Sequence, residues 1–193
     1  MATTFPVPAP GENASTALAL ANTRIEGPHG AVELLEDVGA MNEWLRRSLS
    51  AHIPHATPDD LKRVTELRAG IRAAFLSAAS GQAPVAASIS ELNRAAAADP
   101  GAPQLIWVDR SPRVVWAGSD AGGAHGVLAS VARDAIAVLA SGAVMRQCAA
   151  PDCDRLFIPD HGRRIWCSTS CGNRVRGSRH YALNKKVGTR PDG

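Results

Sequence analysis

The sequence has no apolar run of the roughly 18 to 20 residues that a membrane-spanning helix needs. Its most apolar helical stretch, residues 127–140, is interrupted by Arg133 and Asp134. No basic segment precedes an apolar one, because the first Lys or Arg is Arg24, so we expect no secretory signal and a cytoplasmic protein. Aromatic residues are scarce, but hydrophobic residues make up 45% and charged residues 20%. These proportions are ordinary for a globular chain and exclude a wholly disordered protein, a collagen and a coiled coil.

Cysteine is absent until residue 148, and four cysteines then follow within 24 residues: Cys148, Cys153, Cys167 and Cys171. They form two close pairs, C-x4-C and C-x3-C, with thirteen residues between them. Two such pairs are typical of a structural Zn²⁺ site with four thiolate ligands, whereas a catalytic zinc usually keeps one position open. Disulfide bonds would need an oxidising compartment, and a redox pair usually has C-x-x-C spacing, so both alternatives are weaker.

The rest of the chain is predicted to be mostly helical. Apolar residues at helical spacing indicate helices over about residues 31–50, 57–80, 88–98 and 127–141. Thr57 and Ser88 are the predicted caps of the second and third helices. Residues 105–108 and 114–116 are apolar enough to form the two strands of a hairpin, with its turn at residues 109–112. We therefore expect an α+β chain with a flexible tail over residues 1–14, a mostly helical body with one small hairpin over residues 15–143, and a small cysteine-rich finger over residues 144–186. Residues 187–193 would form a second tail.

The finger is predicted to be a treble-clef-like arrangement of knuckle, hairpin and helix. Residues 155–158 and 163–166 would pair as its hairpin, and Phe157 and Trp166 would pack around the metal. Cys171 would open a helix that runs to about Asn184. Gly172 would allow a close backbone approach there, and Asn173 would cap the helix or bridge to a neighbour.

Charge is unevenly distributed along the chain. Residues 1–145 hold 11 basic and 14 acidic side chains, a net charge of −3, whereas residues 146–193 hold 10 basic and 4 acidic ones, a net charge of +6. A strongly basic finger on a slightly acidic body is the pattern expected of a nucleic-acid-binding protein. The alternative is a solvated helix face or a surface that pairs with the body. The predicted nucleic-acid contacts are Arg163, Arg164, Arg174, Arg176, Arg179, Lys185 and Lys186.

The segment from Trp166 to Arg174 resembles the CGNR zinc finger, which is named for a Cys-Gly-Asn-Arg tetrad. The upstream cysteine pair, the dipeptide Leu156-Phe157 and the dipeptide Arg163-Arg164 also resemble that family, over about residues 145–185. The resemblance implies DNA binding. It also implies that an ABATE domain, regarded as a stress-induced transcription regulator region, precedes the finger. The run Leu18–Arg24, with its Asn-Thr pair, is similar to that domain; taken alone, Asn22-Thr23 would be a strand end or a helix cap.

The sequence therefore predicts a bacterial transcription regulator that binds DNA through the finger. Its body would sense a signal, such as a small-molecule effector, or form a homodimer, which the small footprint of one finger favours. We expect no enzymatic activity, because no histidine of the body has a recognisable nucleophile or carboxylate partner in the sequence. An RNA- or ribosome-associated zinc protein and a zinc-stapled protein-interaction module remain as alternatives.

Overall fold

The computed structural model describes residues 5–27, 30–49, 51, 53–117 and 123–188; the side chains of Trp116 and of residues 182–188 lie outside this description. The helices and strands in chain order are α1 (Thr16–Ala21), β1 (Arg24–Gly27), β2 (Gly30–Glu33), α2 (Val38–Leu49), α3 (Pro58–Ala79), α4 (Ala86–Ala97), β3 (Ala102–Val108), β4 (Ser111–Ala117), α5 (Ala124–Ala140), β5 (Arg146–Gln147), β6 (Leu156–Phe157) and α6 (Thr169–Gly188). The strands form three separate antiparallel hairpins, β1–β2, β3–β4 and β5–β6.

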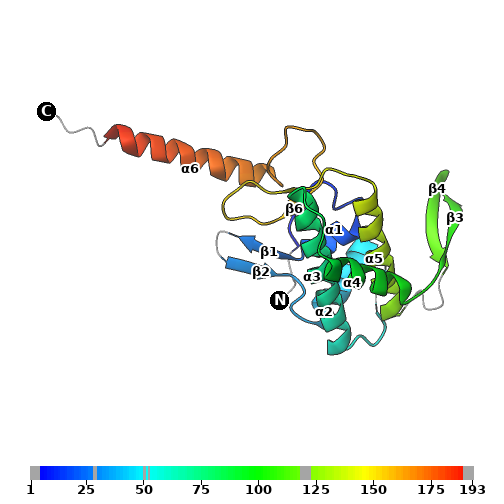
Figure 1. Cartoon of the computed structure of the whole chain (residues 1–193). Helices are drawn as coiled ribbons and strands as arrows, with labels where there is room; N and C mark the ends of the chain where they lie inside the picture. The colour runs from blue at the N-terminus through cyan, green and yellow to red at the C-terminus, as the bar shows by residue number, and fades with distance from the viewer. Residues whose placement is uncertain (1–4, 28–29, 50, 52, 118–122, 189–193) are drawn as a thin grey trace.

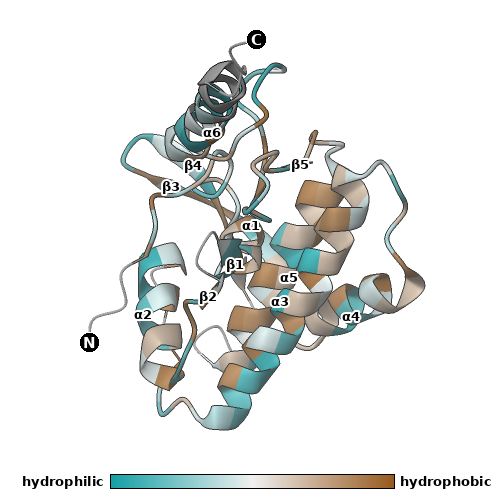
Figure 2. Ribbon diagram, turned by 90° about the vertical axis from the view of Figure 1, so that its left-hand side faces the viewer, coloured by the Kyte–Doolittle hydropathy of each residue, from teal (hydrophilic) through white to brown (hydrophobic). Residues whose placement is uncertain are grey.

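The core of the body lies between α1, α3, α4 and α5 (Figure 1). The short helix α1 buries Leu18 and Leu20 against both α3 and α5, and Ile71 and Phe75 of α3 are fully buried. Apolar residues gather along the helices that face this core, as the hydropathy colouring shows (Figure 2). The α+β prediction of a helical body followed by a small cysteine-rich finger is confirmed.

Helix α3 begins where the sequence predicts. The Thr57 hydroxyl accepts a hydrogen bond from the Asp60 N–H, and the Asp60 carboxylate accepts one from the Thr57 N–H, which makes a reciprocal capping box. The Thr57 hydroxyl also donates to the Asp60 carboxylate at 2.8 Å. The hydrogen bonds that this carboxylate accepts from the Thr57 N–H and from the Thr57 hydroxyl lower the pKa of Asp60. Pro58 occupies the first turn, where a missing N–H costs nothing.

Two predicted helix starts are wrong. The helix expected over residues 31–50 begins only at Val38, because Gly27 and Gly30 close the β1–β2 hairpin and residues 30–33 are strand β2. The cap of α4 is Val85, without a side-chain hydrogen bond, and Ser88 lies inside the helix as a buried residue.

The prediction of a flexible tail is wrong for residues 5–14. Ala9 is buried, and the carbonyl of Pro10 accepts a hydrogen bond from the N–H of Ile158 in the finger. Gly11 has a φ of +92° in this segment, a backbone conformation that favours glycine. The segment therefore packs against the finger instead of extending into solvent.

The last helix of the body, α5, ends where the sequence predicts. It stops before Gly142, whose φ of +67° is the left-handed conformation that often ends a helix.

No helix in the described part of the chain is long and apolar enough to cross a membrane.

Candidate metal centre and nucleic-acid interface

The β5–β6 hairpin brings the first cysteine pair together. Its strands pair Arg146 with Phe157 and Gln147 with Leu156. The Cys148 N–H then donates to the Arg155 carbonyl at 2.9 Å, and the Cys153 N–H donates to the Ala150 carbonyl at 3.1 Å. The chain between the two strands is thus a tight knuckle that holds both sulfurs on one side.

The predicted hairpin of residues 155–158 with 163–166 does not form. Residues 156–157 pair with β5 instead, and residues 163–166 contain no strand. The Ala149 N–H donates to the Ile165 carbonyl at 2.9 Å, which carries the chain past the knuckle toward the second cysteine pair. Helix α6 begins at Thr169, two residues before the predicted start, so Cys171 lies in its first turn.

The four cysteine sulfurs converge on one point. All four Sγ atoms lie within 4.8 Å of one another, and two of the separations, Cys153 to Cys167 and Cys167 to Cys171, are both 3.7 Å. A tetrahedral zinc with Zn–S bonds of about 2.3 Å requires sulfurs about 3.8 Å apart. A disulfide would need about 2.05 Å, and all four cysteines are free. The donor set and its spacing therefore fit a closed four-thiolate zinc site.

The electrostatics of the cluster favour a bound cation. Thiol hydrogen bonds from Cys153 and Cys167, together with the Cys167 N–H that donates to the Cys148 sulfur at 3.4 Å, hold the pKa of Cys148 well below its usual range. Hydrogen bonds with the sulfurs of Cys148 and Cys153 raise the pKa of Cys167, and so do the burial of Cys167 and the negative charges of those two neighbours. Four thiols this close disfavour one another's ionisation, because each negative charge raises the cost of the next. A positive ion between the sulfurs would remove that cost.

A small apolar core surrounds the cluster. Phe157 is fully buried beside the cysteines, and Trp166, half-buried, packs against the same group with Ala9 of the N-terminal segment. A Cβ atom on Gly172 would lie 3.0 Å from the indole of Trp166, so only glycine fits this first turn of α6 without displacing the ring. Asn173 is exposed and accepts a hydrogen bond from Arg176 at 2.6 Å.

The finger is joined to the body by a buried polar cluster that the sequence did not reveal. The Glu12 carboxylate accepts two hydrogen bonds of 2.9 Å from the guanidinium of Arg155, and both side chains are more than 90% buried. Asn22, the C-cap of α1, donates to the Leu156 carbonyl at 2.8 Å and accepts from the Leu156 N–H at 2.9 Å. Desolvation by burial raises the pKa of Glu12, although Arg155 and Asn22 oppose that rise.

A second contact fixes the knuckle from the other side. Arg72 of α3 pairs with the carboxylate of Asp154 and donates to its backbone carbonyl at 2.9 Å. The same carboxylate accepts from the Glu26 N–H of β1 at 2.7 Å. The knuckle therefore contacts the N-terminal segment, α1, α3 and β1, so the finger is packed onto the body.

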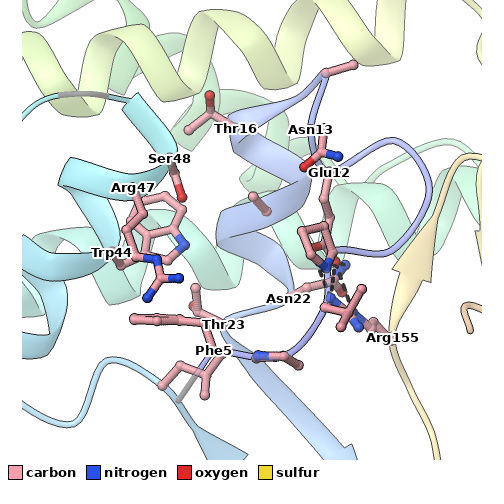
Figure 3. A pocket seen from close by; sticks show the side chains of 16 residues that line it. Phe5, Glu12, Asn13, Thr16, Asn22, Thr23, Trp44, Arg47, Ser48 and Arg155 are labelled. Carbon is pink, nitrogen blue, oxygen red and sulfur yellow. Dashed lines mark hydrogen bonds and ion pairs between the residues drawn. The ribbon is translucent and has the colours of Figure 1, made fainter. Parts of the chain in front are cut away.

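A cavity of about 510 Å³ lies next to this joint, between α1, α2 and the N-terminal segment (Figure 3). Trp44 and Arg47 of α2 form one wall, with the Arg47 guanidinium 5.2 Å from the centre of the Phe5 ring. Glu12, Asn22 and Arg155 form the opposite wall and are hydrogen-bonded to one another (Figure 3). The lining polar groups of that wall are thus already occupied by partners within the protein.

The predicted nucleic-acid contacts fall into two groups. Arg164 and Arg174 form the first group, whose side chains are partly buried within the finger. The guanidinium of Arg164 donates to Asp160 at 2.9 Å and to the carbonyls of Trp166 and Cys167. Arg174 is half-buried, and its Nη2 atom is buried without a hydrogen-bond partner among the described residues.

The remaining predicted contacts lie at the surface or outside the description. Arg163 and Arg179 are exposed, and exposed Arg176 stacks its guanidinium 5.4 Å from the centre of the Trp166 ring. Lys185 and Lys186 belong to α6, but their side chains lie outside the described residues.

Comparison with known protein families finds a match for the body and another for the finger. The ABATE family, described as "putative stress-induced transcription regulator", matches residues 14–142. The CGNR zinc finger family matches residues 145–183, which include all four cysteines and most of α6. No curated protein is similar enough to the chain to match it.

Proposed function

The chain belongs to the ABATE family, and on this premise we propose that it is a transcription regulator that binds duplex DNA through its C-terminal CGNR zinc finger. The proposal makes it a cytoplasmic binding protein and not an enzyme. The four thiols support that location, because a reducing compartment keeps them available to a metal. The stress-induced role would come from the body, to which the finger is joined.

In this proposal the four cysteines hold a structural zinc ion. The ion would neutralise the thiolates and fix the first turn of α6 to the knuckle, since Cys171 lies on the helix and Cys148 and Cys153 lie on the knuckle. Zinc supplies on the order of 10 kcal/mol of folding free energy in small fingers of this kind. It would therefore orient the helix and take no part in a reaction.

The single observation that carries the DNA-binding proposal is the character of α6. This helix contains no acidic residue, and from His161 to Pro191 the sequence has none either. It has no continuous apolar face, and it projects away from the body (Figure 1). A helix that is polar all round and carries charge of one sign gains little from packing or from internal ion pairs, so an anionic partner suits it.

The helix also has the dimensions that a groove requires. An α-helix fits the major groove of duplex DNA, which is about 12 Å wide, and its basic side chains can contact phosphates or base edges there. Arg176 and Arg179 are exposed one turn apart on α6, and Arg163 is exposed in the loop that precedes the helix. These three arginines are the proposed contacts that the described residues support best.

An RNA partner is the second candidate, and one residue favours it. Tyr181 is 73% exposed on α6, and an exposed aromatic ring can stack on an unpaired base. A duplex offers no such base, so the choice of nucleic acid distinguishes the two proposals.

The test is fluorescence anisotropy of labelled duplex DNA and of a labelled RNA stem–loop, titrated with the zinc-loaded full chain over a series of salt concentrations. DNA binding predicts tighter binding of the duplex and a steep loss of affinity with salt, about 0.9 log units per log unit of salt for each phosphate contact. Arg179→Ala should weaken binding and lower that slope by about one. Lys62→Ala is the control, because Lys62 is also an exposed basic residue but lies on α3.

Three outcomes would count against the proposal. Preference for the stem–loop would move the protein to the RNA class. Equal losses for Arg179→Ala and Lys62→Ala would show that α6 is not the binding surface. No binding of either nucleic acid would leave the finger as a protein-interaction module.

A further inference from the structure

The cavity between α1, α2 and the N-terminal segment has two unlike walls. One wall holds the ion pair of Glu12 and Arg155, in which each side chain already has its partner (Figure 3). The other wall belongs to α2 and contains Trp44, Arg47 and Ser48. These three residues are spaced i, i+3 and i+4, so the helix places them on one face, and that face lines the cavity.

The indole of Trp44 is the buried polar group of this second wall. Trp44 is only 4% exposed, and its N–H donates a hydrogen bond to none of the described residues. Figure 3 shows the indole nitrogen on the side of the ring that faces the cavity. Because a buried tryptophan N–H normally has a hydrogen-bond partner, this donor is available to a molecule inside the cavity.

Arg47 adds a positive charge to the same wall. Its side chain is 59% exposed, and its guanidinium lies 5.2 Å from the centre of the Phe5 ring. Its ion pair with Glu43 is loose, at 3.9 Å, whereas Arg46 holds the same carboxylate at 2.5 Å. Most of the N–H donors of the Arg47 guanidinium are therefore left for an acceptor from outside the protein.

The character of these donors determines which chemical group fits. An indole N–H and a guanidinium can donate but not accept, so they need an acceptor. A guanidinium binds a carboxylate or a phosphate through two parallel hydrogen bonds. A phosphate monoester carries a charge of about −1.5 to −2 at pH 7, but Arg47 is the only cation of the lining without a close acidic partner. A carboxylate, with its single negative charge, matches this lining better.

The rest of the lining is largely apolar. It includes Phe5, Pro6, Val7, Pro8 and Leu34. The cavity volume of about 510 Å³ lies within the roughly 300–1,000 Å³ that is typical of small-molecule sites. We propose that this cavity, hereafter the α2 cavity, binds a small organic acid whose carboxylate meets Trp44 and Arg47 and whose apolar body lies among the apolar side chains.

This site goes beyond the proposed function and does not require DNA binding. Arg155 belongs to the finger, yet it lines the same cavity as α2 of the body. A molecule that fills the α2 cavity therefore lies against the joint that holds the finger to the body.

The test titrates the ¹⁵N-labelled, zinc-loaded full chain with sodium benzoate, without nucleic acid, and follows the tryptophan indole N–H peaks by NMR. The chain has four tryptophans, and the peak that disappears in Trp44→Phe is that of Trp44. Benzoate should move this peak and leave the other three in place, with a Kd in the millimolar range that so small a probe allows. Benzamide, which has nearly the same shape but no charge, should bind at least about tenfold more weakly.

Two neighbouring arginines of α2 provide a matched pair of variants. Arg47→Gln should raise the Kd for benzoate at least about tenfold, because it removes the charged donor. Arg46→Gln is the control, since the Arg46 side chain is 60% exposed and pairs with the same Glu43 but does not line the cavity. It should leave the Kd unchanged.

Each other result overturns the proposal. No movement of the Trp44 peak would show that the α2 cavity does not bind such an acid. Equal affinities for benzoate and benzamide would show that the carboxylate is not recognised. Equal losses in Arg46→Gln and Arg47→Gln would reduce the binding to a general attraction between charges. Circular dichroism of each variant keeps unfolding distinct from loss of binding.

Discussion

The side chain of Asn22 is the most informative single position for testing how the finger is attached. Its amide bridges the Leu156 N–H and carbonyl at 2.9 and 2.8 Å, and it also donates to Glu12 at 2.6 Å, all within a buried site. Asn22→Ala would leave two backbone groups of β6 and part of a carboxylate without partners. Each unpaired buried group costs about 1–3 kcal/mol, so the variant should lose about 3 kcal/mol of the free energy of unfolding.

Two measurements follow from this geometry. Denaturant unfolding of the zinc-loaded chain gives the loss of stability. The rate at which zinc passes to an excess of a colorimetric chelator reports on the knuckle, because β6 leads directly out of it and Asn22 holds that strand to α1. Asn22→Ala should lower stability and also accelerate zinc release.

Asn42→Ala provides a matched control. Asn42 bridges the N–H and carbonyl of Ile53 at 3.0 and 3.3 Å in the same way, but both residues belong to the body. Its loss should lower stability without changing the rate of zinc release. The reasoning fails if Asn22→Ala costs less than about 1 kcal/mol, or if the two variants accelerate zinc release equally.

Three further predictions concern the finger, the start of its helix and the body. Cys153→Ser should reduce the zinc content of the purified chain from one ion to well below one, measured by atomic absorption, because it removes one of four converging sulfurs. Gly172→Ala should cost about 1–3 kcal/mol of unfolding free energy, because the new methyl group would press on the indole of Trp166. Gly177→Ala, with nothing within 4 Å, should be neutral or slightly stabilising in the same denaturant assay. Burial raises the pKa of Glu33, but the hydrogen bonds that its carboxylate accepts from Arg68 and from the Leu35 N–H outweigh burial. The net result is a lowered pKa. Its ionised form therefore stabilises the fold above about pH 4.3, and that contribution is lost as the pH falls through the lowered value; the stability difference between wild type and Glu33→Gln should shrink on acidification.

The sequence predicted the parts of the fold that depend on local patterns. The cap and first turn of α3 were predictable because Thr57, Pro58 and Asp60 are neighbours whose preferences agree. The convergence of the four sulfurs was predictable for a similar reason, since each cysteine pair lies close in sequence and one ion requires both pairs.

Periodicity misled the prediction where a strand and a helix bury apolar side chains in succession. Leu34 and Leu35 are buried, and they continue the spacing of the apolar residues of α2 toward the N-terminus. They lie after strand β2, however, so the same spacing covers a hairpin end, a turn and a helix. Only the glycines at positions 27 and 30 marked the reversal of the chain.

The joint between finger and body was not predictable, because its partners are far apart in sequence. Glu12 pairs with Arg155 across 143 residues, and Asn22 bonds Leu156 across 134. This pairing changes how the charge of the finger should be counted. Arg155 is neutralised by a buried acid of the N-terminal segment and Arg164 by Asp160, so neither contributes to the outward basic surface. What is left of the basic excess lies largely on the acid-free helix α6. The surface available to an anionic partner is therefore concentrated on an element that projects from the body (Figure 1).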